Sequence, residues 1–317
     1  MKLVMLDAEL VNPGDLSWGD FARLGEWEVY LETPREEIAA RLAGADIALT
    51  NRAPIRAETV QKCPSLRYIG LFSTGHNQVD IEAAKRQGIV VSNVPGYSTA
   101  CVAQHTIALL LAAVNHVEAY HADVQSGGWT RKGQSLLQYP LAELQGKTMG
   151  IVGLGSIGRA VAKIAAALGM RVLAAGSRPT AEGEALARYC TLEELLAASD
   201  VVSLHCPLLP ATKNIIDEAA LARMKPGAIL LNTARGRLID EEALAKALHS
   251  GHITAAGLDV FSKEPLPPGS PLLTAPNCLI TPHVAWTAPE TRSRLLGVVL
   301  SNLQAFLAGR PENVVNP

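Results

Sequence analysis

The chain has 317 residues, which is long enough for two domains of ordinary size, each with its own buried core. A composition of 48% hydrophobic and 18% charged residues is that of a globular protein and excludes a largely disordered chain. The net charge of -2, with no long run of either sign, argues against a nucleic-acid-binding or membrane-surface protein.

Residues 1–95 alternate short apolar runs with helical patterns. We predict helices at residues 34–42 and 79–87, the second ended by Gly88. The strands that we predict are rich in Val, Ile or Leu and cover residues 3–6, 47–50, 68–71 and 89–92. Strand–helix alternation of this kind predicts a mostly parallel sheet covered by helices.

A long helix is predicted at residues 99–125, where it suits a connector between two domains. Its most apolar part, residues 107–114, is shorter than the ~20 residues that a membrane span needs. Residues 129–139 are polar and poorly periodic and predict a loop or arm. The histidines of the long helix are expected to pack or to face solvent: His105, His116 and His121.

A second series of strands and helices extends from residue 149 to residue 281. Its predicted strands cover residues 149–152, 172–175, 201–204, 229–232, 257–260 and 279–281. A terminal helix is predicted from residue 287, and the residues spaced to bury one of its faces are Leu295, Val298, Val299, Asn302, Leu303 and Phe306. If this helix packs on the first domain, that domain is discontinuous in sequence.

The segment Gly153-Leu154-Gly155-Ser156-Ile157-Gly158 fits the pattern GxGxxG between a predicted strand and a predicted helix. In such a turn the glycines allow a tight bend, close approach of a pyrophosphate, and close packing of helix on strand. The N-terminus of the helix supplies free N–H groups and a favourable dipole for phosphate. We therefore predict a dinucleotide site here; the alternative is a tight strand-to-helix turn that binds no ligand.

The end of the next predicted strand bears on the choice of cofactor. An acidic residue ~20 positions after the glycine turn would bind the ribose of NAD. The chain has Gly176-Ser177-Arg178 instead, and Ser177 and Arg178 suit a 2′-phosphate. We therefore predict a preference for NADP(H), with NAD(H) as the alternative cofactor and a solvated loop arginine as the alternative role of Arg178.

Three polar side chains follow the ends of predicted strands, where ligands collect in an open α/β sheet. Reduction of a 2-oxo acid needs a cation for the carboxylate, and the forked guanidinium of Arg235 suits it. It also needs a proton donor, and His283 suits this role because the ordinary pKa of an imidazole lies near neutrality. Glu264 would orient the imidazole and favour its protonated form. Each residue alone is more often a surface or core residue; the three together predict an active site.

With these motifs the sequence resembles the D-isomer-specific 2-hydroxyacid dehydrogenase family over essentially its full length. The stretches that carry the resemblance are STGHNQVD (73–80), VPGYST (94–99), GLGSIG, HCPLLPAT (205–212), NTARGRLID (232–240), GLDVFSKEP (257–265) and TPHVAW (281–286). The resemblance implies two doubly wound α/β domains: a flavodoxin-like substrate domain (1–98 plus 287–317) and a Rossmann dinucleotide-binding domain (99–286).

The resemblance also implies roles for individual residues. Arg235, Glu264 and His283 match the catalytic trio of the family. The substrate-binding positions are Ser73, Thr74, Gly75, His76, Arg235, His283 and Trp286. The cofactor-binding positions are Thr74, Gly153, Gly155, Ser156, Ile157, Gly158, Ser177, Arg178, Cys206, Thr212, Thr233, Ala234, Asp259 and Ala285.

Within the family the motifs look most like the glycerate dehydrogenase and hydroxypyruvate reductase group. This implies reduction of hydroxypyruvate or glyoxylate in a polar pocket walled by Trp286, and a homodimer. The arm would reach the partner's active site, whereas Trp129 could equally pack in the core or in an interface. Phosphoglycerate dehydrogenation is an alternative, and a nucleotide-sensing corepressor of the same fold is an alternative from another class.

The five cysteines are scattered and form no CxxC pair, which predicts reduced thiols rather than disulfides or a zinc site. The N-terminus lacks an apolar run long enough for a signal peptide. From the sequence we therefore expect a cytoplasmic enzyme that contains no metal and binds neither nucleic acid nor membranes.

Overall fold

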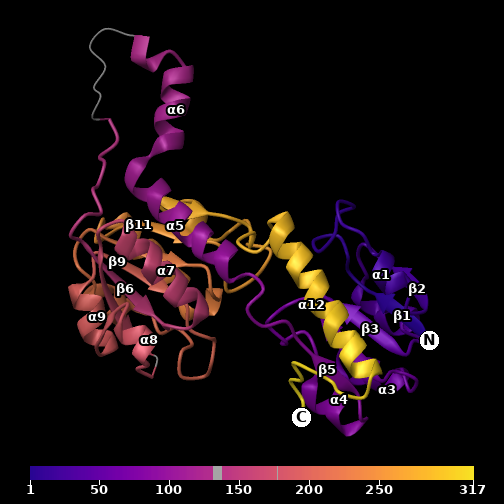
Figure 1. Ribbon diagram of the computed structural model, residues 1–317. Coiled ribbons are helices and arrows are strands. Elements are labelled where there is room, and N and C mark those ends of the chain that lie inside the picture. Colours follow the sequence, from indigo (N-terminus) through magenta and orange to yellow (C-terminus); the bar gives the residue numbers. More distant parts are fainter. Residues whose placement is uncertain (131–137, 177) are drawn as a thin grey trace. The chain divides into compact units, whose positions relative to one another are not determined.

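The computed structural model describes residues 1–130, 138–176 and 178–317. It consists of two compact units (Figure 1). The discontinuous unit comprises Met1–Ser98 and Trp286–Pro317, and the central unit comprises Thr99–Ala285. Trp286, the last residue of the TPHVAW motif, therefore belongs to the discontinuous unit.

The discontinuous unit is built on a five-stranded parallel sheet of order β2-β1-β3-β4-β5. Its strands are β1 (Lys2–Met5), β2 (Glu26–Val29), β3 (Ile47–Thr50), β4 (Tyr68–Leu71) and β5 (Val90–Ser92). This is the flavodoxin-like order, as expected. The sequence analysis missed β2, because Glu26 and Glu28 make this edge strand polar and its residues are not buried.

Helices cover both faces of this sheet: α1 (Gly19–Ala22), α2 (Ile38–Arg41), α3 (Ala57–Lys62), α4 (Ile81–Arg86) and α12 (Pro289–Leu307), with a 3-10 turn at Arg35–Glu37. The terminal helix α12 returns to this sheet and lies across it (Figure 1). Leu295, Val299 and Leu303 are buried in its core, and Phe306 packs on Tyr68 with ring centroids 4.7 Å apart.

The central unit is built on a seven-stranded parallel sheet of order β12-β11-β10-β9-β6-β7-β8. Its strands are β6 (Thr148–Val152), β7 (Arg171–Ala175), β8 (Arg188–Tyr189), β9 (Val201–Leu204), β10 (Ala228–Asn232), β11 (Ile253–Leu258) and β12 (Cys278–Ile280). The strands β6, β9 and β10 are buried along their whole length, as parallel strands covered on both faces must be. The two-residue strand β8 was not predicted, and β11 begins and ends earlier than the predicted 257–260.

The helices of the central unit are α5 (Thr99–Asn115), α6 (Val117–Gln125), α7 (Ser156–Ala167), α8 (Ala181–Glu184), α9 (Leu192–Ala198), α10 (Glu218–Arg223) and α11 (Glu241–His249). Short 3-10 turns occur at Gly128–Thr130, Gly236–Leu238 and Pro271–Leu273. Two clusters of buried apolar residues fill the space between these helices and the two faces of the sheet.

The single long helix predicted at residues 99–125 is wrong. It is broken at His116, whose φ of 48° lies in the left-handed region, and α5 and α6 meet at a bend of 55°. Among the described residues, no single helix is long and apolar enough to cross a bilayer; only α5 and α6 together pass that test of length and composition.

The helix α6 differs from the other helices of its unit because none of its residues is buried. Figure 1 shows it standing away from the sheet of the central unit. Exposed apolar side chains lie on and beside it: Val117, Val124, Trp129 and Leu141. Trp129 is 70% exposed, which rules out the core position considered for it, and residues 131–137 of the predicted arm lie outside the described residues.

Candidate active site

The glycine turn joins β6 to α7 at the carboxyl edge of the central sheet. Gly153 has a φ of 96°, and a side chain on it would meet the backbone nitrogen of Cys206 at 2.6 Å. A side chain on Gly158 would meet the carbonyl oxygen of Gly153 at 2.3 Å. Both positions therefore require glycine, one for the bend and one for the packing of α7 on β6.

The middle glycine faces open space. Apart from its chain neighbours, no atom of the described residues lies within 4 Å of the point where a side chain on Gly155 would begin. Gly155 is also the N-cap of α7 and makes no side-chain cap, and the N–H groups of the first helical turn have no partner within the helix. The turn therefore presents N–H groups at a helix N-terminus, where a pyrophosphate can bind. The residues present fit a dinucleotide.

The end of β7 lies beside this turn. Gly176 has a φ of 73°, and a side chain on it would begin 3.9 Å from the backbone nitrogen of Gly153. Arg178 is exposed, and residues 171–180 contain no carboxylate. Ser177, which we predicted to contact a 2′-phosphate, lies outside the described residues.

Arg235 follows β10 in a turn that buried Asn232 holds from both sides. The Asn232 side chain accepts a hydrogen bond from the N–H of Ala234 (3.0 Å) and donates one to the carbonyl oxygen of Arg235 (2.9 Å). The guanidinium of Arg235 donates to the carbonyl oxygen of Ala234, and within the described part of the chain it forms no ion pair. Its fork therefore remains available to a carboxylate.

Glu264 and His283 form a close pair in the same unit. The Nδ1 atom of His283 lies 2.7 Å from Oε2 of Glu264, and Oε1 of Glu264 accepts the N–H of Phe261 at 3.0 Å. Both side chains are about one-third exposed. Because Nδ1 faces the carboxylate, Nε2 is the ring nitrogen left to face a substrate.

The backbone of His283 is strained. Its φ of 57° lies in the left-handed region, which is uncommon for a residue with a side chain. Buried Asp259 stabilises this turn by accepting the N–H groups of Val284 (2.9 Å) and Ala285 (3.0 Å) and the hydroxyl of Thr281 (2.6 Å). Strain of this kind, held by surrounding bonds, is typical of functional sites.

Gly236 allows the turns that carry the catalytic residues Arg235 and Glu264 to pack closely together. A side chain on Gly236, next to Arg235, would lie 1.8 Å from the backbone of Phe261. The turn that carries Arg235 therefore packs directly on the segment that leads to Glu264. Three residues far apart in sequence thus lie at one edge of the sheet, as we predicted from the strand ends.

The predicted substrate loop, which contains Ser73, Thr74, Gly75 and His76, follows β4 in the discontinuous unit. The hydroxyl of Ser73 donates to the carbonyl oxygen of Gly75 (2.6 Å), and that of Thr74 donates to the carbonyl oxygen of Val94 (2.7 Å). The side chain of Gln78 donates to the Ser73 hydroxyl at 2.9 Å. Trp286 is 7% exposed in the same unit and packs edge-on against Tyr97.

The remaining predicted cofactor contacts lie in the central unit, near the carboxyl ends of its strands. Cys206 and Thr233 are buried, and Thr212 is partly buried and closes the loop after β9 by hydrogen bonding to Leu209 and Pro207. His205, at the end of β9, has its Nε2 atom 2.8 Å from the Ser203 hydroxyl. Burial lowers the pKa of His205 to about 4, so this ring is neutral near pH 7.

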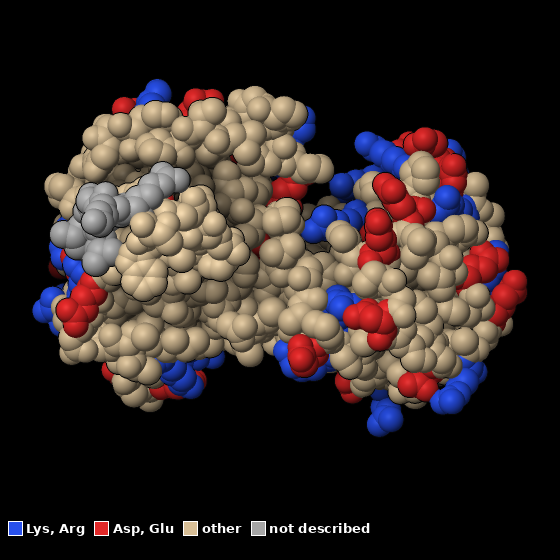
Figure 2. Space-filling model, turned by 90° about the horizontal axis from the view of Figure 1, so that it is seen from above, with Lys and Arg blue, Asp and Glu red and all other residues tan. Residues whose placement is uncertain are grey.

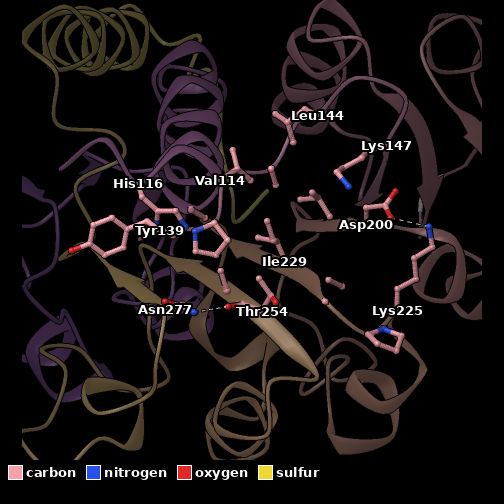
Figure 3. A pocket seen from close by; sticks show the side chains of 18 of the residues that line it. Val114, His116, Tyr139, Leu144, Lys147, Asp200, Lys225, Ile229, Thr254 and Asn277 are labelled. Atoms are coloured by element: carbon pink, nitrogen blue, oxygen red, sulfur yellow. Dashed lines mark hydrogen bonds and ion pairs between the residues drawn. The ribbon is translucent and has the colours of Figure 1, made fainter. Parts of the chain in front are cut away.

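One sizeable pocket of the described residues lies away from the catalytic trio. A cavity of about 470 Å³ lies at the amino edge of the central sheet, beside His116, Tyr139 and Ile229 (Figure 3). Two pairs of its polar groups are bonded to each other: Lys225 with Asp200 at 3.0 Å, and Asn277 with the carbonyl oxygen of Thr254 at 3.0 Å. None of the catalytic trio lines this cavity, so volume alone does not mark the active site.

The fold, the glycine cradle and the histidine–carboxylate pair define an oxidoreductase that uses a nicotinamide dinucleotide. The sequence profile described as "D-isomer specific 2-hydroxyacid dehydrogenase, NAD binding domain" matches residues 107–285, more than half of the chain. The chain belongs to the D-isomer-specific 2-hydroxyacid dehydrogenase family, as predicted from its motifs.

Three known proteins illustrate the similarity. The chain is 48% identical to a hydroxypyruvate reductase of Blautia hydrogenotrophica, with 100% of both chains aligned. It is 42% identical to a glycerate dehydrogenase of Methylorubrum extorquens, covering 99% of this chain and 98% of that one. The structure of an acyclic imino acid reductase in complex with NADPH and D-Arg superimposes with a TM-score of 0.87 at 32% identity, covering 99% and 100% of the two chains.

Proposed function

We propose that this enzyme reduces hydroxypyruvate or glyoxylate to the corresponding 2-hydroxy acid, in the manner of a D-glycerate dehydrogenase. The observation that carries the proposal is the 2.7 Å contact between His283 and Glu264 in the same unit as Arg235, which forms no ion pair with any described residue. The full-length similarity to a hydroxypyruvate reductase and a glycerate dehydrogenase supports the substrate class.

In this mechanism Arg235 binds the carboxylate of the 2-oxo acid through two parallel hydrogen bonds. A nicotinamide dinucleotide held at the glycine turn Gly153–Gly158 would supply the hydride for the carbonyl carbon. His283 donates the proton from Nε2 to the carbonyl oxygen as negative charge develops there. Glu264 accepts a hydrogen bond from Nδ1, which fixes the orientation of the ring and leaves Nε2 for the transfer. The backbone N–H groups of the loop Ser73–His76 would hold the substrate carboxylate, and Trp286 would wall the pocket.

We propose in addition that NADPH is preferred over NADH. The support is the exposed Arg178 and the absence of a carboxylate at residues 171–180, where an acid would bind a free ribose. The structural neighbour that binds NADPH shares the fold over nearly the whole chain. Changing Arg178 to Ala should raise the KM for NADPH and leave that for NADH unchanged, whereas the exposed Arg188→Ala should change neither.

The activity test is direct. Purified protein is mixed with NADPH or NADH and with hydroxypyruvate, glyoxylate, pyruvate or 3-phosphohydroxypyruvate, and absorbance at 340 nm is followed. We expect the fastest decrease with hydroxypyruvate or glyoxylate and NADPH. No decrease with any substrate would favour a nucleotide-binding corepressor, and a lower KM for NADH would overturn the cofactor preference.

We also propose that the enzyme is a homodimer in the cytoplasm. The helix α6 has no buried residue and carries Val117 and Val124 at its exposed surface, and a second copy of the chain would cover them. Figure 2 shows few charged side chains over this part of the central unit. The five cysteines are free thiols, as suits a reducing compartment. Light scattering on the purified protein should give twice the chain mass of 33.6 kDa.

A further inference from the structure

Two neighbouring residues of α5, His105 and Thr106, contact the two strand ends that carry catalytic side chains. The Nε2 atom of His105 lies 2.9 Å from the hydroxyl of Thr281, two residues before His283. The hydroxyl of Thr106 lies 2.8 Å from the hydroxyl of Thr233, two residues before Arg235. The same spacing on two strands indicates a shared purpose rather than ordinary packing.

The geometry of the sheet explains how one helix reaches both strands. β11 lies between β10 and β12, and α5 packs directly over it, because a side chain on Gly257 would meet Cβ of Leu109 at 2.9 Å. Successive residues of a helix point about 100° apart. His105 can therefore reach the end of β12 while Thr106 reaches the end of β10.

Proton counting fixes the direction of the bond from His105. The hydroxyl of Thr281 donates its single proton to Oδ1 of Asp259, at 2.6 Å. The Nε2 atom of His105 must therefore carry a proton and donate it to Thr281, and it lies 3.6 Å from the same Asp259 oxygen. Since Asp259 also accepts the N–H groups of residues 284 and 285, His105 is the outer member of the network that holds the strained turn of His283.

The same reasoning applies to Thr106. Its hydroxyl donates to the carbonyl oxygen of Val102 at 2.8 Å, so towards Thr233 it can only accept. The Thr233 hydroxyl therefore donates to Thr106. Both residues are buried, so this bond has no water to replace it if Thr106 is changed. The bond between Thr233 and Thr106 fixes the start of the turn that carries Arg235, whose guanidinium would bind the substrate carboxylate.

We propose that His105 and Thr106 are positioning residues of the active site. His105 holds the turn of the proton donor His283 in place, and Thr106 holds the turn of the carboxylate-binding Arg235 in place. This inference rests on the catalytic roles proposed above for Arg235 and His283. It makes α5, the helix with which the chain enters the central unit, a part of the active-site framework.

The test separates the two neighbours by their kinetic signatures. His105→Leu should lower kcat by about 10- to 100-fold with little change in KM, because a slightly misplaced proton donor slows the chemical step. Thr106→Val, which keeps the shape of the side chain, should raise the KM for the 2-oxo acid by about 10-fold with a smaller change in kcat. His105→Gln and Thr106→Ser restore a donor and an acceptor and should recover most of the activity.

Gln104→Ala is the matched control, since Gln104 is exposed on the same turn of α5 and should leave both parameters unchanged. Binding of NADPH, followed by fluorescence, and the melting temperature should stay close to those of the wild type in every variant. The inference is overturned if His105→Leu and Thr106→Val show the same change, or if activity falls only with the folded fraction. It is also overturned if Gln and Ser restore nothing.

His283→Ala and Arg235→Lys are assayed in parallel so that the two levels of the proposal can be told apart. If they keep full activity, the catalytic roles themselves are wrong. If they are impaired while His105→Leu and Thr106→Val match the wild type, only the positioning role is wrong.

Discussion

The two edges of the central sheet are made of the same seven strands but differ in chemistry. At the amino edge, a cavity of about 470 Å³ is lined in part by polar side chains that bind each other, such as Lys225 and Asp200. At the carboxyl edge, within the described residues, Gly155 begins a helix without a side-chain cap, and Arg235 forms no ion pair. His283 is held there in a strained conformation.

The comparison shows that unmet bonding capacity, rather than empty volume, distinguishes the functional edge. Parallel strands all end at one edge, so the turns after them converge, and helix N-termini add their dipoles at the same edge. The opposite edge receives helix C-termini and loops whose polar groups bond to one another. Each of the following predictions tests this difference between the two edges of the central sheet.

The largest effect is expected at the proton donor. His283→Ala should lower turnover by roughly 10²–10⁴-fold, because a positioned general acid contributes about that factor. Binding of NADPH should survive, since the glycine turn is untouched. His249→Ala, at the exposed end of α11, is the matched control and should have full activity in the same assay. Unchanged turnover in His283→Ala would remove this residue from the mechanism.

A smaller loss is expected at the carboxylate-binding fork. Arg235→Lys keeps the positive charge but loses one of two parallel hydrogen bonds, which is worth about 10- to 100-fold in kcat/KM. The loss should appear mainly in KM, because the substrate carboxylate is bound in both the ground state and the transition state. Initial rates over a range of hydroxypyruvate concentrations measure it. A Lys variant equal to the wild type would show that charge alone is sufficient.

A third effect concerns stability. His205, at the carboxyl end of β9, has its pKa lowered by burial from 6.5 to about 4. Between these values the unfolded chain binds a proton that the folded protein does not, so stability falls as the pH is lowered through this range. The upper limit is about 3 kcal/mol, and the true loss is smaller because part of the ring is accessible to solvent.

Urea unfolding at pH 7 and pH 5 measures this loss. His205→Gln should lose less stability between the two pH values than the wild type does. His249→Ala, which removes an exposed histidine, should leave the difference between the two pH values as it is. If His205→Gln and the wild type have the same dependence on pH, the buried ring does not cause it.

The smallest effect is expected at the amino edge. Lys225→Met removes the ion pair with Asp200. The side chains of Lys225 and Asp200 are 37% and 27% exposed, so the loss should cost less than about 1 kcal/mol of stability. The carboxylate of Asp200 keeps its bond from the N–H of Thr148. Turnover should not change. A marked fall in kcat would show that the amino edge takes part in catalysis and would end the contrast between the edges.

The sequence predicted most of the framework because its signals are local. The strands β3, β4 and β9 were placed with their correct bounds, since each is a short buried run of branched apolar residues. The glycine turn was recognisable because its glycines have separate physical tasks. β2 and β8 were missed because one is polar and the other has only two residues.

The break at His116 was missed for a related reason. The apolar pattern continues through this position, and a left-handed histidine has no signal in the helical period. Trp129 shows a similar limit: an aromatic residue in a polar stretch suits core or surface, and only the structure shows it exposed. His105 was assigned to packing or solvent because its partner Thr281 lies 176 residues away in the chain.

The sequence by itself determined the fold class, the dinucleotide turn, the family and the identity of the three residues expected to catalyse the reaction. Each of these follows from short sequence motifs, or from the rule that polar residues at the ends of parallel strands meet at one edge of the sheet. The tertiary structure decided what holds those residues in place. Contacts between distant segments hold the strained turn of His283, which buried Asp259 supports. They also include the hydrogen bonds of His105 and Thr106 to two strand ends. Such contacts arise only when the sheet and α5 have packed together, so no local pattern in the sequence contains them.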